Sequence, residues 1–240
     1  MSGNGIFLRA EWRNLAMLNY EVKPTLLAKL VPAGTELDQW QGKTFVSLVG
    51  FRFLKTRVCG IAIPFHRNFD EVNLRFYVRR KDGADIKRGV VFIREIVPRW
   101  AIAAMARRLY NERYIALPMD HRAGRSDESG LSVEYAWRSQ GGWNRIRLAS
   151  EGEPALAQEG SQEQFITEHY WGYTAQRDGG TVEYHVVHPS WRIWSGRGAS
   201  LEGDVTELYG PELAAVLRQK PSSAFLAEGS AVTVSHGRRI

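Results

Sequence analysis

One short segment of this chain places four polar side chains on one face of a predicted strand. Apolar and polar residues alternate between Asp70 and Arg80, and successive side chains of a strand point to opposite faces. One face therefore carries Val72, Leu74, Phe76 and Val78, and the other carries Glu71, Asn73, Arg75 and Tyr77. In a small barrel the polar face would line a cavity, whereas on an outer strand it would be solvated. Alternation alone leaves both readings open.

The chemistry of a lumen built from these residues would be the recognition of a small polar or anionic molecule. A guanidinium such as that of Arg75 can hold a carboxylate by paired hydrogen bonds. Glu71 and Tyr77 could hydrogen-bond a hydroxyl or carbonyl group, and Glu71 could also serve as a general acid or base.

Other reactive constellations are weak or missing in the sequence. His185 and His188 are three residues apart on a predicted strand, so they would point to opposite faces and make a poor metal pair. The sequence contains no HExxH motif, no GxSxG elbow, no phosphate-binding glycine loop and no dinucleotide fingerprint. We therefore expect no metal and no cofactor. Cys59 is the single cysteine, and its apolar surroundings predict a small buried residue.

Composition narrows the class of protein. The chain has 240 residues and a net charge of +6, which could attract anionic ligands or nucleic acid. No nucleic-acid-binding motif accompanies the charge, so nucleic-acid binding is not expected, although a basic interaction surface bearing Trp191 and Trp194 remains an alternative. The N-terminus lacks the apolar core of a signal peptide, and no apolar run is long enough to span a membrane. We expect a cytoplasmic protein with one domain over residues 1–240.

The strands and helices that must position the polar face follow from periodicity. The run Val90–Val97 predicts a strand buried on both faces, and the apolar stripe that follows Pro98 predicts a helix over Arg99–Asn111. Further predicted elements are strands at Leu15–Val22, Phe45–Phe53, Leu131–Arg138, Trp143–Ala149, Tyr170–Gln176, Thr181–His188, Trp191–Trp194 and Ala224–Ser235, and helices at Pro24–Val31, Gln162–His169 and from Pro211. Asp120–Ser129 and Ser150–Gly160 are predicted loops. Strands dominate and mostly join by hairpins, which indicates a mainly β or α+β fold with an antiparallel or mixed barrel.

The order of these segments resembles a known family. The stretch WRNLAMLNYEVKPTLLAKLVPAGTELDQWQGKTFVSLVGF is followed by FDEVNLRFYV, RGVVFI, RRLYNERYIALPM and HPSW. This ordered set, over roughly residues 8 to 235, resembles the YqjF-like family of uncharacterised bacterial proteins. The resemblance implies an acetoacetate decarboxylase-like fold, a cone-shaped and mostly antiparallel β-barrel around a cavity with a few short helices outside. It favours the lumen reading for Glu71.

The resemblance does not carry the decarboxylase chemistry with it. That mechanism needs a lysine nucleophile, and the comparable segment Asn111–Ala116 contains none. Glu21 stands where the decarboxylase has a substrate-binding arginine, and only Glu71 matches a functional position. We therefore expect no Schiff-base decarboxylase.

Three functional hypotheses follow. The first is a barrel that binds a small polar or anionic ligand, such as a carboxylate, with Asn73, Arg75 and Tyr77 lining the pocket and Arg113 and Tyr114 at its rim. The second is a lyase or hydrolase in which Glu71 is the general acid or base. The third is a basic interaction or nucleic-acid-binding protein. The sequence leaves open whether any reaction is catalysed and whether the chain forms a homo-oligomer.

Overall fold

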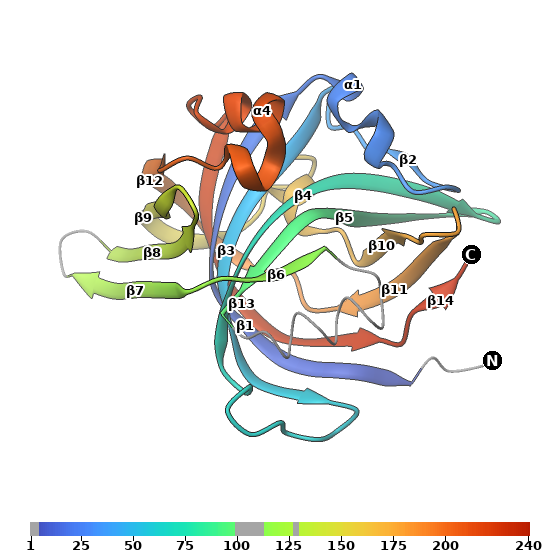
Figure 1. The fold of residues 1–240 in the computed structure, drawn as a ribbon, viewed down its shortest axis with the longest axis horizontal. Coiled ribbons are helices and arrows are strands. Elements are labelled where there is room, and N and C mark those ends of the chain that lie inside the picture. Colours follow the sequence, from blue (N-terminus) through green and yellow to red (C-terminus); the bar gives the residue numbers. More distant parts are fainter. Residues whose placement is uncertain (1–4, 99–112, 127–129) are drawn as a thin grey trace.

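The computed structural model describes residues 5–98, 113–126 and 130–240, and most of them belong to strands (Figure 1). The strands are β1 (Ile6–Val22), β2 (Glu36–Leu37), β3 (Thr44–Val58), β4 (Phe69–Asp82), β5 (Asp85–Val97), β6 (Tyr114–Ala116), β7 (Met119–Ser126), β8 (Gly130–Ser139), β9 (Gly142–Leu156), β10 (Trp171–Ala175), β11 (Thr181–Val187), β12 (Arg192–Glu202), β13 (Ser223–Ser235) and β14 (Arg238–Arg239). The helices are α1 (Pro24–Leu27), which continues as a 3₁₀ turn over Ala28–Leu30, α3 (Gln162–Thr167) and α4 (Thr206–Leu217). The predicted helix Arg99–Asn111 lies outside the described residues.

Seven of these strands close into a ring. Neighbours pair in the order β11, β10, β5, β4, β3, β1 and β13, and a short pairing of β13 with β11 completes the circle. The ring is antiparallel except where β10 pairs with β5 in parallel. In Figure 1 these strands wrap around a common interior. The prediction of a mainly β fold built on an antiparallel barrel is confirmed.

The remaining large strands extend the sheet away from the ring. β13 pairs with β12 near its start and with β11 near its end, and β12 leads on to β9, β8 and β7. The extension and α4 lie against the outer face of the ring. The apolar residues of β4 (Val72, Leu74, Phe76 and Val78) pack there into one cluster with Trp137 of β8, Ile146 of β9 and Leu213 of α4. Each large apolar side chain buried in this way stabilises the fold by roughly 1.5–3 kcal/mol.

The opposite face of the same strands points into the ring. It contributes a second apolar cluster that includes Met17, Val49, Phe51 and Phe53. Because both faces of β3 and β4 are covered, their interiors are buried on either side. This confirms the predicted alternation in β4 and the strand predicted at Phe45–Phe53.

Several local predictions are wrong, each for a physical reason. Cys59 is exposed, because Cys59 and Gly60 both have positive φ and form the two-residue turn between Val58 and Ile61. Trp191 and Trp194 are buried rather than on the surface.

The predicted loops are also shorter than expected. Residues 119–126 form β7, which pairs with β8, and β9 continues to Leu156, where it pairs with β12. Polar composition therefore marked exposed strands of the extension, not loops.

The helix predicted to begin at Pro211 is the second half of a longer element. α4 starts at Thr206 and kinks at Gly210, whose φ of 78° is not helical. Within the described residues, no helix has the length and apolar character needed to cross a membrane.

Candidate functional site

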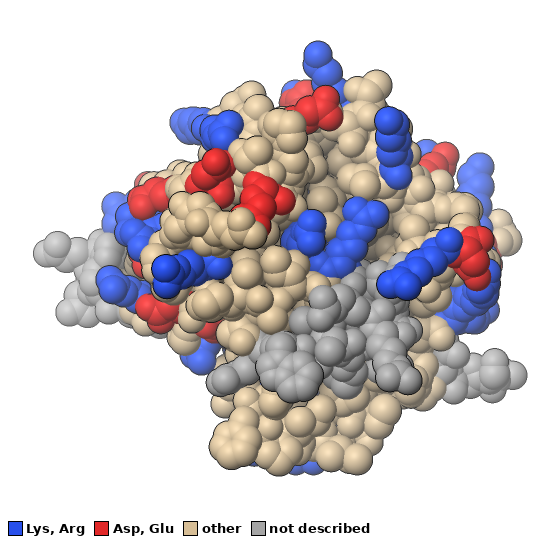
Figure 2. Space-filling view, viewed as in Figure 1, with Lys and Arg blue, Asp and Glu red and all other residues tan. Residues whose placement is uncertain are grey.

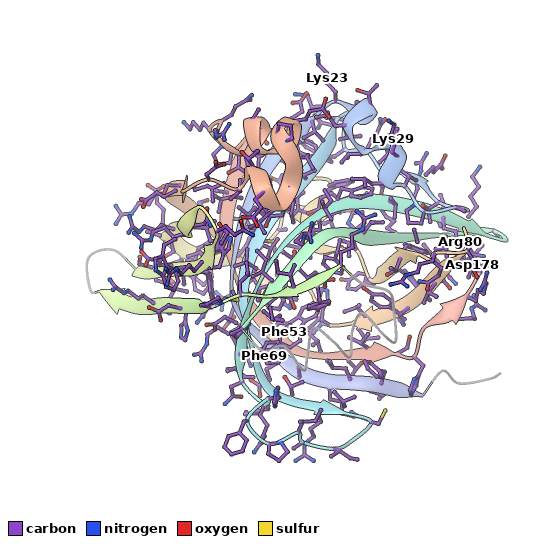
Figure 3. All side chains as sticks on the ribbon, in the orientation of Figure 1. Lys23, Lys29, Phe53, Phe69, Arg80 and Asp178 are labelled. Carbon is purple, nitrogen blue, oxygen red and sulfur yellow. The ribbon has the colours of Figure 1, made fainter. Side chains whose placement is uncertain are left out.

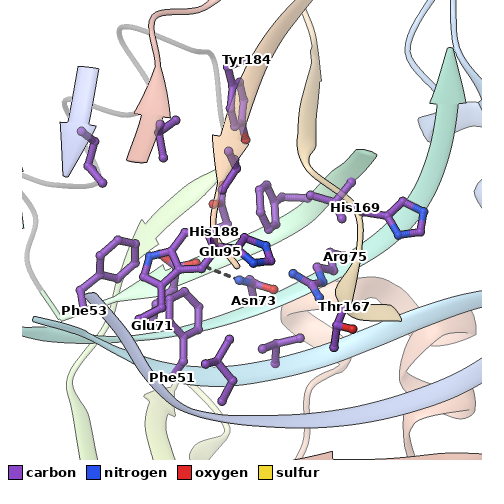
Figure 4. Close-up of a pocket in the computed structure, with 18 of the residues that line it drawn as sticks. Phe51, Phe53, Glu71, Asn73, Arg75, Glu95, Thr167, His169, Tyr184 and His188 are labelled. Atoms are coloured by element: carbon purple, nitrogen blue, oxygen red, sulfur yellow. Dashed lines mark hydrogen bonds between the residues drawn. The ribbon is translucent and has the colours of Figure 1, made fainter. Parts of the chain in front are cut away.

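A cavity of about 140 Å³ lies inside the strand ring. This is close to the size of a cavity that holds a benzene-sized molecule. Much of its wall is aromatic, with Trp12, Phe51, Phe53, Phe69, Phe92 and Trp191 among the lining residues. Its polar lining comes from Glu71, Asn73, Arg75, Glu95, Tyr114, Thr167, His169 and His188 (Figure 4). The cavity therefore joins an apolar wall to a concentrated polar patch.

Glu71 is the centre of a hydrogen-bonded group on β4. Its side chain is only 2% exposed, and its two oxygens accept from Asn73 Nδ2 at 2.8 Å and from Tyr114 Oη at 3.0 Å. Tyr114 arrives there because β6 pairs in parallel with β5, which places it opposite Glu95. Glu95 in turn lies opposite Asn73 across β4 and β5 and is also buried. The Oδ1 atom of Asn73 is buried and has no hydrogen-bond partner among the described residues.

Arg75 lies two residues further along β4, on the same face. It is 9% exposed, and its Nη2 donates to the carbonyl of Ile166 at 3.3 Å. Its Nε is buried without a partner among the residues that the structure describes. The guanidinium lies 5.8 Å from the ring centroid of Tyr77. Burying a charge is costly unless it is paired, and this guanidinium retains a buried hydrogen-bond donor that no described residue uses.

Tyr77 lies behind Arg75 and is not among the residues that line the cavity. Its hydroxyl shares a 2.6 Å hydrogen bond with Ser47 Oγ, which also donates to Asn19 Oδ1 at 2.6 Å. This buried network ties β4 to β3 and β1, so Tyr77 supports the ring beside Arg75.

His169 follows α3 and belongs to a second polar chain. Its Nε2 lies 3.0 Å from Asp38 Oδ2, which also accepts from Arg88 Nε at 2.7 Å. Burial alone would raise the pKa of Asp38, but the hydrogen bonds from His169 and Arg88 lower that pKa to about 2. Burial lowers the pKa of His169, which favours its neutral form. The ionised Asp38 therefore holds the proton on Nε2, and Nδ1 is left without a partner among the described residues.

His188 is held on the cavity wall between aromatic rings. It stacks on Trp191 with ring centroids 4.1 Å apart, and the Tyr170 ring lies 4.9 Å away on a tilt. Its Nδ1 lies 2.9 Å from the carbonyl of Pro189, so Nδ1 carries the proton in the neutral ring. Burial, and to a smaller extent the charge of Arg75, lower the pKa of His188. His188 is thus a neutral imidazole in a fixed tautomer.

The structure brings four of the six predicted site residues together. Glu71, Asn73, Arg75 and Tyr114 all line the cavity. Tyr77 is on the same face but behind it, and the side chain of Arg113 is exposed and is not among the lining residues. Sequence reasoning missed Glu95, His169, His188 and the aromatic wall. Alternation predicted that His185 and His188 point to opposite faces, and His188 begins the HPSW motif of the family. Neither observation predicted that His188 faces a cavity.

The positions of the lysines bear on Schiff-base chemistry, which needs an amine at the reacting carbonyl. The seven lysines are Lys23, Lys29, Lys43, Lys55, Lys81, Lys87 and Lys220. All of them lie in the described part of the chain, and none lines the cavity. Glu21 is exposed and pairs with Lys43 at 2.8 Å, outside the cavity. Among the described residues, no cluster of three or more His, Cys, Asp or Glu side chains is suited to a metal ion.

Sequence comparison relates the chain to uncharacterised proteins. Residues 9–231 match the family DUF2071, whose description is "Uncharacterized conserved protein". The chain is also 25% identical to the "Uncharacterized protein YqjF" of Bacillus subtilis (strain 168), over 212 residues that cover 86% of this chain and 84% of the relative.

Structural comparison relates the fold to acetoacetate decarboxylase. The decarboxylase from Legionella pneumophila matches with a TM-score of 0.69 and 14% identity, covering 98% of this chain and 87% of that one. The enduracididine biosynthesis enzyme MppR, in a structure complexed with pyruvate, matches with a TM-score of 0.67 and 11% identity, covering 100% and 91% of the two chains. At these identities the likeness establishes the fold alone, and the predicted acetoacetate decarboxylase-like fold is confirmed.

Proposed function

This chain belongs to the DUF2071 family and has the acetoacetate decarboxylase-like fold, and from that premise we propose that its cavity binds a small organic acid. Arg75 takes the carboxylate of the ligand, and the aromatic wall takes its carbon body. The ligand forms no imine with the protein, because no lysine is among the residues that line the cavity.

The observation that carries this proposal is the buried guanidinium of Arg75. Among the described residues, only the Ile166 carbonyl accepts a hydrogen bond from it. A carboxylate placed against the guanidinium would satisfy the buried Nε and neutralise the charge. The arrangement is the usual one for a ligand site, with an apolar pocket and a few placed polar groups. A related fold also supports the proposal, since MppR has been solved with pyruvate bound.

The aromatic wall narrows the ligand further. Phe51, Phe53 and Phe69 meet around one part of the cavity, and the rings of Phe53 and Phe69 stack with centroids 4.6 Å apart. Such a wall favours an apolar body over a second charged group. The expected ligand is therefore a compact acid with one carboxylate and a short aliphatic or aromatic body.

The test is calorimetric titration of the protein with isovalerate and benzoate, each beside its neutral amide. Arg75→Met keeps the length of the side chain but removes the charge. We expect this variant to bind both acids roughly 10- to 100-fold more weakly, since hydrogen bonds to a charged group contribute about 1.5–3 kcal/mol. The amides should bind the wild-type protein weakly and should be insensitive to the substitution.

Arg79→Met is the matched control. Arg79 lies on the same strand, but it is exposed and pairs with Glu36 at 2.9 Å, so its loss should leave binding unchanged. If Arg75→Met binds the acids as tightly as the wild-type protein does, Arg75 is not the carboxylate anchor and the proposal is wrong.

A second candidate is a lyase or hydrolase in which Glu71 is the general acid or base. The burial of Glu71 on the cavity wall favours this candidate over a solvated surface role. The same titration samples discriminate the two functions. Proton NMR of the amide samples after long incubation shows unchanged amides for a binding protein and the corresponding free acids for a hydrolase.

A further inference from the structure

Two hydrogen-bond acceptors in the cavity have no use in the binding of a simple carboxylate. One is Asn73 Oδ1, which is buried and has no hydrogen-bond partner among the described residues. The amide nitrogen of the same side chain donates to Glu71. The other is His188 Nε2, to which no described residue donates. Since Nδ1 of His188 donates to the Pro189 carbonyl, Nε2 of the neutral ring presents a lone pair. Figure 4 shows both side chains projecting into the space beside Arg75.

The position of these acceptors relative to Arg75 defines what they can contact. Asn73 and Arg75 are two residues apart on β4, and side chains at that spacing on one face are separated by about 7 Å. A carboxylate held by the guanidinium therefore directs its neighbouring carbon toward the Asn73 amide. The charge of Arg75 also reaches His188, since it contributes to lowering the pKa of that imidazole.

We propose that the ligand carries a hydrogen-bond donor on the carbon next to its carboxylate, and that Asn73 Oδ1 and His188 Nε2 accept from it. This inference rests on the proposed function, because Arg75 must hold the carboxylate for the donor to be placed. The donor is a hydroxyl or an ammonium group, so the ligand is a 2-hydroxy acid or a 2-amino acid with a short apolar body. A buried acceptor such as Asn73 Oδ1 discriminates strongly against an analogue that leaves it unpaired.

The test uses three acids with the same branched carbon skeleton. Isovalerate has no donor, 2-hydroxyisovalerate has a hydroxyl and valine has an ammonium group at the carbon in question. Calorimetry on the wild-type protein should show that one of the two donor-bearing acids binds about tenfold or more tightly than isovalerate. Which of the two binds more tightly identifies the donor.

Two variants assign the preference to its residues. His188→Phe keeps a ring to stack on Trp191 but removes Nε2. Asn73→Leu keeps the volume but removes Oδ1, together with the amide donor to Glu71. Each should reduce the preference for the donor-bearing acid over isovalerate several-fold. His185→Phe is the matched control, because His185 stacks on Trp171 in the same way but does not line the cavity.

A measurement on the unaltered protein covers the case in which a variant fails to fold. The ¹⁵N resonance of His188 Nε2 should shift when the preferred acid is added and should stay in place with isovalerate. Equal binding of all three acids by a cavity that depends on Arg75 would overturn this inference and leave the proposed function standing. If none of the three acids binds, the proposed function fails and this inference fails with it.

Discussion

Asp38 joins a buried histidine to a surface arginine. Its side chain is nearly inaccessible, and it accepts from Gln39 N at 3.0 Å as well as from His169 and Arg88. Burial alone would raise the pKa of this carboxylate. The hydrogen bonds from its donors outweigh that effect, so the pKa of Asp38 is lowered to about 2. These hydrogen bonds hold the residue that follows β2 against the segment after α3, where His169 lines the cavity.

This carboxylate should make the fold sensitive to acid. The pKa of Asp38 is lower in the folded chain than in the unfolded one, so its contribution is complete above about pH 4 and is lost as pH falls toward 2. His169 acts in the same direction from about pH 6.5 downward, because burial lowers its pKa and the unfolded chain binds the proton more readily. We expect Asp38→Asn to lower the free energy of unfolding at pH 7 by about 2 kcal/mol and to flatten its decline between about pH 4 and 2.

Denaturant unfolding at a series of pH values checks this prediction. Asp178→Asn is the control, because Asp178 pairs with Arg239 at 2.7 Å on the surface, where such pairs contribute less than about 1 kcal/mol. Equal pH profiles for the wild-type protein and Asp38→Asn would contradict the role given to Asp38.

At the scale of elements, β13 serves both the extension and the ring. It pairs with β12 at Phe225–Ala227 and with β11 at Thr233 and Val234, and Gly229 lies between these two pairings. Asn14 has a φ of 55°, and the pairing of β1 with β3 shifts register between Arg13 and Ala16. Gly229 has a φ of 78°, and a Cβ there would lie 2.0 Å from the carbonyl oxygen of Trp12. These irregularities bend both strands. Glycine is required at 229 for two separate reasons, its backbone conformation and the contact.

Gly229→Ala should therefore destabilise the fold by more than the cost of the left-handed conformation alone, which is about 1–3 kcal/mol. Gly34→Ala separates the two contributions. Gly34 also has a φ of 78°, but a Cβ there would meet no atom within 4 Å. Chemical denaturation of both variants measures the difference, and equal losses would show that the backbone of Trp12 moves away without cost.

At the scale of the molecule, the lysines lie outside the lining of the cavity, whereas Glu71, Arg75 and Glu95 line it. Figure 2 shows lysine and arginine interspersed with acidic residues over the visible face, and Figure 3 shows Lys23 and Lys29 on the outer side of the molecule near α1. The partly buried Lys87 pairs with Asp82 and Glu183 and lies 4.1 Å from the Trp171 ring centroid. No lysine is among the residues that line the cavity, whereas the buried Glu71 is.

This arrangement predicts that pyruvate cannot be trapped on the protein. Incubation with pyruvate and borohydride, followed by intact-mass measurement, should show no adduct, because an imine needs a desolvated amine at the carbonyl. An acetoacetate decarboxylase treated in parallel is the positive control. A stoichiometric adduct on any lysine would show that the cavity admits an amine nucleophile after all.

The sequence by itself determined the faces of the strands and the missing nucleophile. Period-two alternation in β4 separated the core residue Leu74 from Glu71 and Arg75, because a side chain's face depends only on its place along the strand. The ordered motifs indicated the fold, and the absence of lysine from Asn111–Ala116 needed no structure at all.

Only the tertiary structure decided which face is the lumen and what completes it. Tyr114 reaches Glu71 from 43 residues away, and His169 reaches Asp38 from 131 residues away. Local periodicity does not predict such contacts, because the two residues meet only when distant strands pair and the ring closes. The same closure turned a polar strand face, which would otherwise have been solvated, into the wall of a cavity.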